Sequence, residues 1–222
     1  MAALEEEAHE LVRRMPRSEN VGPRLAIWEG DGLVVVVAGV GKVAAALATQ
    51  YACDVFKPRS AVAIGLAGGL EDGVRPGQVI VATGAVQHDM DARPLTDAKG
   101  VIPGIAVATI AADPAAADKV LIAARLESRD AQPGLVLTGD QIVTSRNVRD
   151  ALLRDFPAAT CVDMETAAFA QVALQNGVPW TALRVISDSA DESFDLRKVI
   201  GLGVSTAAKL FESIIQTVAN DL

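Results

Sequence analysis

The pattern of apolar and polar positions along the chain predicts alternating helices and buried strands. Apolar side chains recur at helical spacing over residues 4–15, and Pro16 ends that helix. Near-continuous apolar runs elsewhere are typical of strands covered on both faces of a sheet. Further helices are expected over 39–56, which opens with a glycine-rich turn, and over 113–127, 148–156, 165–177 and 196–220. Strands are expected over 60–70 and 134–144, each running into a turn, and over 77–89, 160–164 and 180–191.

Two remaining regions complete the predicted fold. The runs 24–30 and 33–39 flank Gly30-Asp31-Gly32, which is a turn signal for a β-hairpin, and residues 91–107 are expected to form an irregular loop. The alternation predicts a three-layer αβα sandwich with a mixed, mostly parallel central sheet. Because no repeat or linker divides the sequence, we expect a single domain over residues 1–222.

Composition and charge narrow the function classes. Half of the residues are hydrophobic and the net charge is −8, which disfavours nucleic acid and anionic membrane surfaces as partners. No segment is typical of a signal peptide or a membrane span. Cys53 and Cys161 lie far apart, without metal-like spacing, and are expected to be reduced thiols. We therefore expect a cytoplasmic protein.

Charged residues follow several of the expected strands. In open α/β sheets, ligands bind beyond the carboxyl ends of the strands. Asp163 and Glu165 follow one apolar strand, and Arg184 and Asp188 lie toward the end of another. Carboxylates with one arginine in a small pocket suit recognition of a polyhydroxyl group together with acid–base chemistry. We expect Asp163 to satisfy backbone or neighbouring groups rather than to meet a substrate.

Three weaker motifs each allow more than one interpretation. "AGVGKVAAA" lacks the third glycine of a dinucleotide-binding loop, because Ala44 stands there, and favours a tight turn that could still line a pocket. "GLAGGL" fits either a close-packed turn or backbone amides that approach a ligand. His88 lies beside Asp89 and Asp91, but two histidines in the whole chain give little support for a metal site, and none is expected.

Several blocks together resemble a known family. They are "ALEEEAHEL", "GVGKVAAA", "LAGGLEDGVRPGQVIV", "QHDMD", "TGDQIV", "VDMETAAFA" and "LRVISDSAD". Because of the order and spacing of these blocks, the chain resembles the purine nucleoside phosphorylase superfamily. Within it, the chain resembles the 5′-methylthioadenosine/S-adenosylhomocysteine nucleosidases. The resemblance covers almost the whole chain. It implies a nucleoside phosphorylase/hydrolase-like fold, a homodimer, a small-molecule adenine nucleoside as partner, and no cofactor.

The resemblance also implies roles for individual residues. Glu7 would be the general base that activates water, and Asp188 the general acid that protonates N7 of adenine. Glu165 would bind the ribose hydroxyls, while Arg184 would hold the sugar and the attacking water. Further substrate contacts are implied for Val40, Gly68, Ile142, Val143, Met164, Ser187 and Phe194.

The implied reaction is hydrolysis of a nucleoside with release of adenine. Similar phosphorylases carry an arginine where Ala63 stands, so water rather than phosphate is the expected nucleophile. The family's nucleosidases usually carry a serine at the position of Leu66 and an aromatic residue at that of Ile142.

Two further departures concern chain segments. The family's first strand begins about five residues before the position of Met1, and the region 91–107, which often completes a neighbour's pocket, is short. The alternatives are a hydrolase of another adenosine derivative (hopanoid- or futalosine-type), a phosphate-dependent phosphorylase, and a non-catalytic nucleoside-binding protein.

Overall fold

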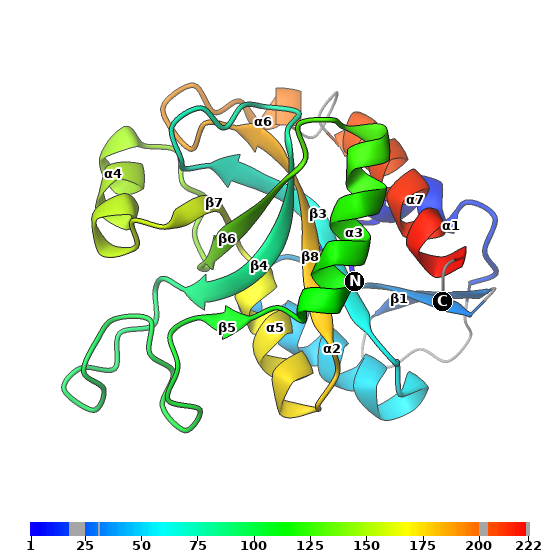
Figure 1. The fold of residues 1–222 in the computed structure, drawn as a ribbon, viewed down its shortest axis with the longest axis horizontal. Helices are drawn as coiled ribbons and strands as arrows, with labels where there is room; N and C mark the ends of the chain where they lie inside the picture. Colours follow the sequence, from blue (N-terminus) through cyan, green and yellow to red (C-terminus); the bar gives the residue numbers. More distant parts are fainter. Residues whose placement is uncertain (18–24, 31, 200–203, 221–222) are drawn as a thin grey trace.

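The computed structural model describes residues 1–17, 25–30, 32–199 and 204–220, and it shows strands surrounded by helices (Figure 1). The strands are β1 (Ala26–Gly30), β2 (Leu33–Val37), β3 (Ala61–Gly69), β4 (Val79–Gln87), β5 (Ile110–Ala111), β6 (Gln132–Thr138), β7 (Ala159–Asp163) and β8 (Trp180–Asp188). The helices are α1 (Glu5–Val12), α2 (Lys42–Phe56), α3 (Pro114–Glu127), α4 (Arg146–Asp155), α5 (Thr166–Gln175), α6 (Leu196–Lys198) and α7 (Val204–Asn220).

The main sheet closes on itself. The strands follow one another in the order β4, β6, β7, β3 and β8, and β8 pairs with β4 as well as with β3. β4, β6 and β7 run parallel, as do β3 and β8, whereas the β3–β7 and β4–β8 pairs are antiparallel. The sheet is therefore mixed, as predicted, and most of its paired residues belong to the parallel pairs. Its closure brings the carboxyl ends of β3 and β7 together, with Gly68 opposite Val162.

Residues 1–3 join the β1–β2 hairpin to this sheet. The amide of Ala2 donates to the carbonyl of Val36 (2.9 Å), and the carbonyl of Ala2 accepts from Ala38 (2.9 Å). On the other side, the carbonyl of Met1 accepts from the amide of Ile64 at 2.8 Å. These residues thus pair as a short strand between β2 and β3 and lead directly into α1.

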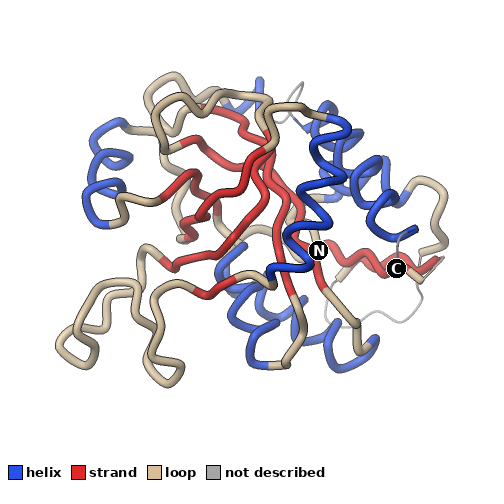
Figure 2. Tube along the Cα trace, viewed as in Figure 1, coloured by secondary structure: helices blue, strands red, loops and turns tan. Residues whose placement is uncertain are grey.

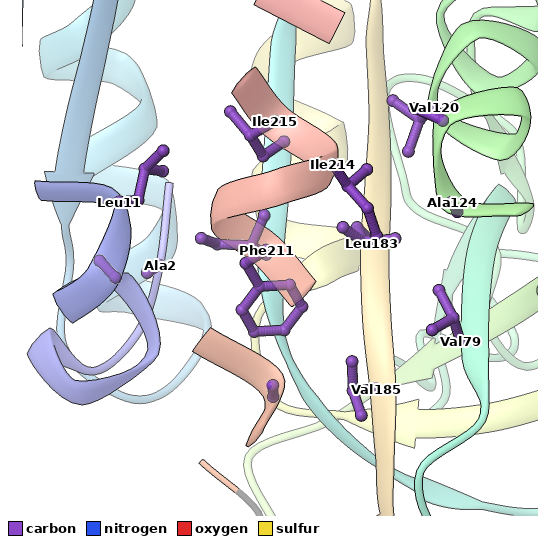
Figure 3. Packing of buried hydrophobic residues seen from close by; sticks show 14 of the residues in the cluster. Ala2, Leu11, Val79, Val120, Ala124, Leu183, Val185, Phe211, Ile214 and Ile215 are labelled. Atoms are coloured by element: carbon purple, nitrogen blue, oxygen red, sulfur yellow. The ribbon is translucent and has the colours of Figure 1, made fainter. Parts of the chain in front are cut away.

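Alternate side chains of the strands pack into different hydrophobic clusters, because successive residues point to opposite faces. Val79 and Leu183 belong to the cluster that α1, α3 and α7 cover, with Phe211 of α7 at its centre (Figure 3). Their strand neighbours Ile80 and Ala182 pack on the other face, against α5. The sheet is therefore covered on both faces, which explains why its strands read as continuous apolar runs.

Most of the elements predicted from the sequence are confirmed to within a few residues. The expected helix over 196–220 is described as α6 and α7, and residues 200–203 between them lie outside the described part, as does Asp31 of the predicted turn. Residues 91–107 contain no described helix or strand and lie in a long excursion between β4 and β5 (Figure 2). The two-residue β5 was not predicted. None of the described helices is long and apolar enough to cross a membrane.

Gly134 provides a test of the tight packing between β4, β6 and β7. A methyl group added there would lie 2.7 Å from Cγ2 of Ile80 and 2.8 Å from Cβ of Thr160. We expect Gly134→Ala to lower the free energy of unfolding by about 1–3 kcal/mol through overpacking, measured by urea denaturation.

The matched control is Gly30→Ala in β1, where the nearest atoms to the added methyl, in Met15 and Pro16, are 3.8 Å away. This substitution is expected to leave stability nearly unchanged. An equal loss of stability in both variants would contradict the close packing of Gly134.

Candidate active site

Two glycines of β3 lie against the polar side chains predicted for the site. In the parallel pairing with β8, Gly65 is opposite Arg184 and Gly68 is opposite Asp188. A methyl group on Gly65 would overlap Nη1 of Arg184 and lie 3.1 Å from Oε1 of Glu7. One on Gly68 would lie 3.2 Å from Oδ1 of Asp188. The missing side chains therefore let three distant polar residues approach one strand.

Arg184 is fully buried within β8, four residues before the strand ends, and is held by a polar network. Its Nη2 lies 2.8 Å from Oδ2 of Asp163, and its Nε and Nη2 donate to the hydroxyl of Thr166 at 3.0 and 2.7 Å. The Thr166 hydroxyl donates to Asp163, as does the hydroxyl of Thr138 at 2.6 Å. A buried cation requires such acceptors. The expectation that Asp163 satisfies neighbouring groups is thus confirmed.

Glu7 is a buried carboxylate anchored by main-chain donors. Its Oε2 accepts from the amides of Ala3 (3.1 Å) and Leu4 (3.0 Å), and its Oε1 accepts from the amide of Leu66 (3.0 Å). Burial raises the pKa of Glu7 above its usual value, although these amides and the charge of Arg184 oppose the shift. A carboxylate of raised proton affinity suits a group that takes a proton from water near neutral pH.

Glu165 connects the end of β7 with the turn before α2. It is buried at the N-cap of α5, and its Oε1 accepts from the amide of Gly41 at 2.8 Å. Burial, reinforced by the charge of Asp163, raises the pKa of Glu165 to about 7, and the charge of Arg184 opposes this. The half-buried Met164 precedes it. The pKa of Glu165 therefore depends on the charges of Asp163 and Arg184.

Asp188 ends β8 and remains partly exposed. Its Oδ2 accepts from the hydroxyl of Ser187 (2.5 Å), and its Oδ1 accepts from the amide of Ala190 (2.8 Å). Ala190 has a left-handed backbone (φ 50°), which turns the chain away from the strand. The half-buried Phe194 lies in the segment that follows. Asp188 is thus fixed by its immediate neighbours, with one side open to solvent.

The apolar residues predicted for the site differ in exposure. Val40, in the turn before α2, and Ile142, after β6, are each 53% exposed, whereas Val143 is buried. Cavities of about 400 and 420 Å³ lie between α1 and α7 and between β2, α2 and β3, and neither is lined by Glu165 or Asp188. The predicted site therefore combines a buried polar centre with exposed apolar residues.

The two acids of the "QHDMD" segment form ion pairs with basic side chains of the protein. Asp89 pairs with Lys42 at 2.7 Å and Asp91 with Arg93 at 2.5 Å, while the buried ring of His88 lies against Gly139. Across the ranges that the structure describes, no group of three or more His, Cys, Asp or Glu side chains could hold a metal ion.

A family model covers this whole arrangement. The model of the phosphorylase superfamily matches residues 1–216. The chain belongs to the phosphorylase superfamily.

Relatives within the superfamily include nucleosidases. The 5′-methylthioadenosine/S-adenosylhomocysteine nucleosidase of Geobacillus thermodenitrificans is 34% identical over 198 residues, which cover 86% of this chain and 84% of that protein. The nucleosidase of the same name from Actinobacillus succinogenes is 35% identical over 165 residues, 73% of this chain and 70% of that protein.

Solved structures of superfamily members share the fold. The Neisseria meningitidis 5′-methylthioadenosine/S-adenosylhomocysteine nucleosidase in complex with methylthio-immucillin-A has a TM-score of 0.92 at 30% identity, covering 100% of this chain and 97% of that one. A futalosine hydrolase mutant of Helicobacter pylori has a TM-score of 0.86 at 26% identity, covering 97% and 96%. The predicted family and fold class are thereby confirmed.

Thr166 of the polar centre was missed from the sequence, and Gly65 was noted only as part of the "GLAGGL" motif, without its place beside Arg184. Gly65 interrupts an apolar strand, and a glycine inside a strand often marks the close approach of another group. Thr166 stands directly after Glu165, where a hydroxyl among the alanines of a helix start gave a weak signal. Both residues serve Arg184: Gly65 leaves room for its guanidinium, and Thr166 accepts its hydrogen bonds.

The raised pKa of Glu165 predicts a pH dependence of stability. The unfolded carboxyl releases its proton near its ordinary pKa of 4.5, whereas the folded one holds it until about 7. The folded state thus binds the extra proton, and stability should fall as the pH rises from about 5 to about 7. Glu165→Gln should flatten this slope, measured by urea denaturation at several pH values. A difference between the two proteins that does not vary with pH would contradict the shift.

Proposed function

We propose that this protein is a nucleosidase that hydrolyses the N-glycosidic bond of 5′-methylthioadenosine or S-adenosylhomocysteine and releases adenine. The observation that carries the proposal is the approach of Glu7, Arg184 and Asp188 to the two glycines of β3. Hydrolysis of a glycosidic bond needs a base for water, an acid for the leaving group and a carboxylate near the cationic sugar. The named relatives support adenine thionucleosides as the substrate class.

Each acid has a role in this reaction. Glu7 accepts a proton from water while the water oxygen bonds to C1′ of the ribose. The C1′–N9 bond breaks, its electron pair leaves with adenine, and Asp188 delivers a proton to N7. Glu165 accepts hydrogen bonds from the ribose hydroxyls, and its charge stabilises the oxocarbenium-like sugar. The products are adenine and the free thioribose derivative.

The charge balance of the site favours water over phosphate as the nucleophile. The guanidinium of Arg184 is already paired with Asp163 and bonded to Thr166. A phosphate dianion needs additional cationic donors, usually arginines. Ala63 stands where the resemblance places such an arginine, and it is fully buried.

A second candidate is a hydrolase of another adenosine derivative, of the hopanoid or futalosine type. Ile142 is a largely exposed aliphatic residue where the resemblance places an aromatic that stacks on adenine, and Leu66 replaces a serine. The similarity to the structure of the Helicobacter pylori futalosine hydrolase mutant supports this second function.

An assay of adenine release distinguishes these candidates. The purified protein is expected to release adenine from 5′-methylthioadenosine in buffer without phosphate. The released adenine is measured by chromatography. Activity that requires phosphate and yields a ribose 1-phosphate derivative would instead establish a phosphorylase. No adenine from methylthioadenosine or adenosylhomocysteine, with release from another adenosine derivative, would favour the second candidate.

Replacement of the proposed acid separates an enzyme from a binding protein. Asp188→Asn keeps the size of the side chain but removes its proton, so kcat should fall by about 10²–10⁴. Binding of methylthioadenosine, measured by calorimetry, should persist, because Glu165 and Arg184 are unchanged. Turnover near the wild-type rate would show that Asp188 is not the acid.

A further inference from the structure

Helix α2 begins with two amides that bond to acids from distant strand ends. The amide of Gly41 donates to Oε1 of Glu165, and the amide of Lys42 donates to Oδ1 of Asp140, each at 2.8 Å. Gly39 and Gly41 both have positive φ values, 90° and 99°, which few other residues adopt. The direction of the Gly41 amide therefore depends on contacts that hold this turn in place.

Lys42 is fixed at both ends by acids. Besides its amide bond to Asp140, its Nζ lies 2.7 Å from Oδ1 of Asp89. Asp89 in turn accepts the amide of Asp140 through Oδ2 at 3.1 Å. These three contacts close a ring of three residues, which we call the Lys42 clamp (Lys42, Asp89 and Asp140). The clamp ties the start of α2 to the segments that follow β4 and β6.

A second route joins Lys42 to α5, the helix that directly follows Glu165. Its Nζ donates to Oε1 of Gln87 at 3.3 Å, and Nε2 of Gln87 donates to Oε1 of Gln171 at 2.6 Å. Gln171 lies on α5, whose N-cap is Glu165. The start of α2 is thus connected to α5 both through the Gly41 amide and through the Lys42 side chain, and this fixes one helix end relative to the other.

We propose that the Lys42 clamp is a positioning device for Glu165: it orients the Gly41 amide that holds the carboxylate toward the ribose. In its kinetic part this inference rests on the proposed function. The clamp itself does not touch the reacting atoms. The side chains of Lys42 and Asp89 are 19% and 33% exposed, so their pair is partly screened by solvent and acts locally on the turn before α2. Its effect should therefore appear at Glu165 rather than in the unfolding transition.

Amide exchange tests the clamp without any substrate. Lys42→Met keeps most of the side-chain length but removes the ammonium group. Hydrogen exchange at the Gly41 amide, followed by NMR on the full chain, should become faster by about tenfold or more, because the turn opens more often. Lys119→Met, an exposed position on α3 with the same loss of charge, is the matched control and should leave this amide unchanged. Unaltered exchange at Gly41 in Lys42→Met would overturn the proposal.

Kinetics with the preferred nucleoside test the consequence for the site. Lys42→Met should lower kcat/KM by about ten- to a hundredfold, since misplacing a substrate-binding group by a fraction of an ångström is costly. Lys42→Arg, which retains the charge, should recover part of the loss. Lys42→Met combined with Asp89→Asn should be no worse than either single variant, because both break the same ring. Fully additive losses would contradict a shared clamp.

The two proposals fail in different ways. If the wild-type protein releases no adenine from any adenosine derivative, the proposed function is wrong, whereas the exchange result at Gly41 still decides whether the clamp holds the turn. If the wild type is active and Lys42→Met matches it in kcat/KM, the clamp does not position Glu165.

Discussion

The side chain of Arg184 is 1% exposed, so the protein itself must supply the acceptors that water would otherwise provide to its guanidinium. Asp163 provides the opposite charge, and Thr166 accepts from two of the nitrogens. On the other side Gly65 provides only space, because a single methyl group there would overlap the guanidinium. Two separate stretches of sequence, at Gly65 and at 163–166, are thus constrained by one buried charge.

The same charge sets the electrostatics of the neighbouring carboxylates. It opposes the rise in pKa that burial imposes on Glu7 and Glu165, whereas the charge of Asp163 reinforces the rise at Glu165. Arg184 and main-chain amides therefore offset part of the cost of placing these carboxylates away from water. Carboxylates of raised pKa are suited to proton transfer near neutral pH.

The sequence predicted the elements well because hydrophobic periodicity and glycine or proline signals are local properties. It predicted that acids would gather at strand ends, and the structure places Glu7, Arg184 and Asp188 against β3. It did not reveal the closure of the sheet or β5, because strand pairing is a tertiary property. The Gly41 amide at Glu165 was also missed, since a backbone contact between distant segments leaves no residue-type signal. The homodimer, the cytoplasmic location and the single domain stay predictions.

Closure of the sheet limits how the protein adapts to different ligands. Because β8 pairs with both β3 and β4, no strand of the ring can shift in register without straining its neighbours. Asp188 ends β8 of this ring and Glu7 accepts from the Leu66 amide of β3, whereas Val40, Ile142 and Phe194 lie on connecting segments outside the ring. Residues on these connections can be exchanged without altering the strand pairing of the ring. The division between a fixed frame and replaceable connections offers a physical reason why one superfamily fold serves differently named enzymes.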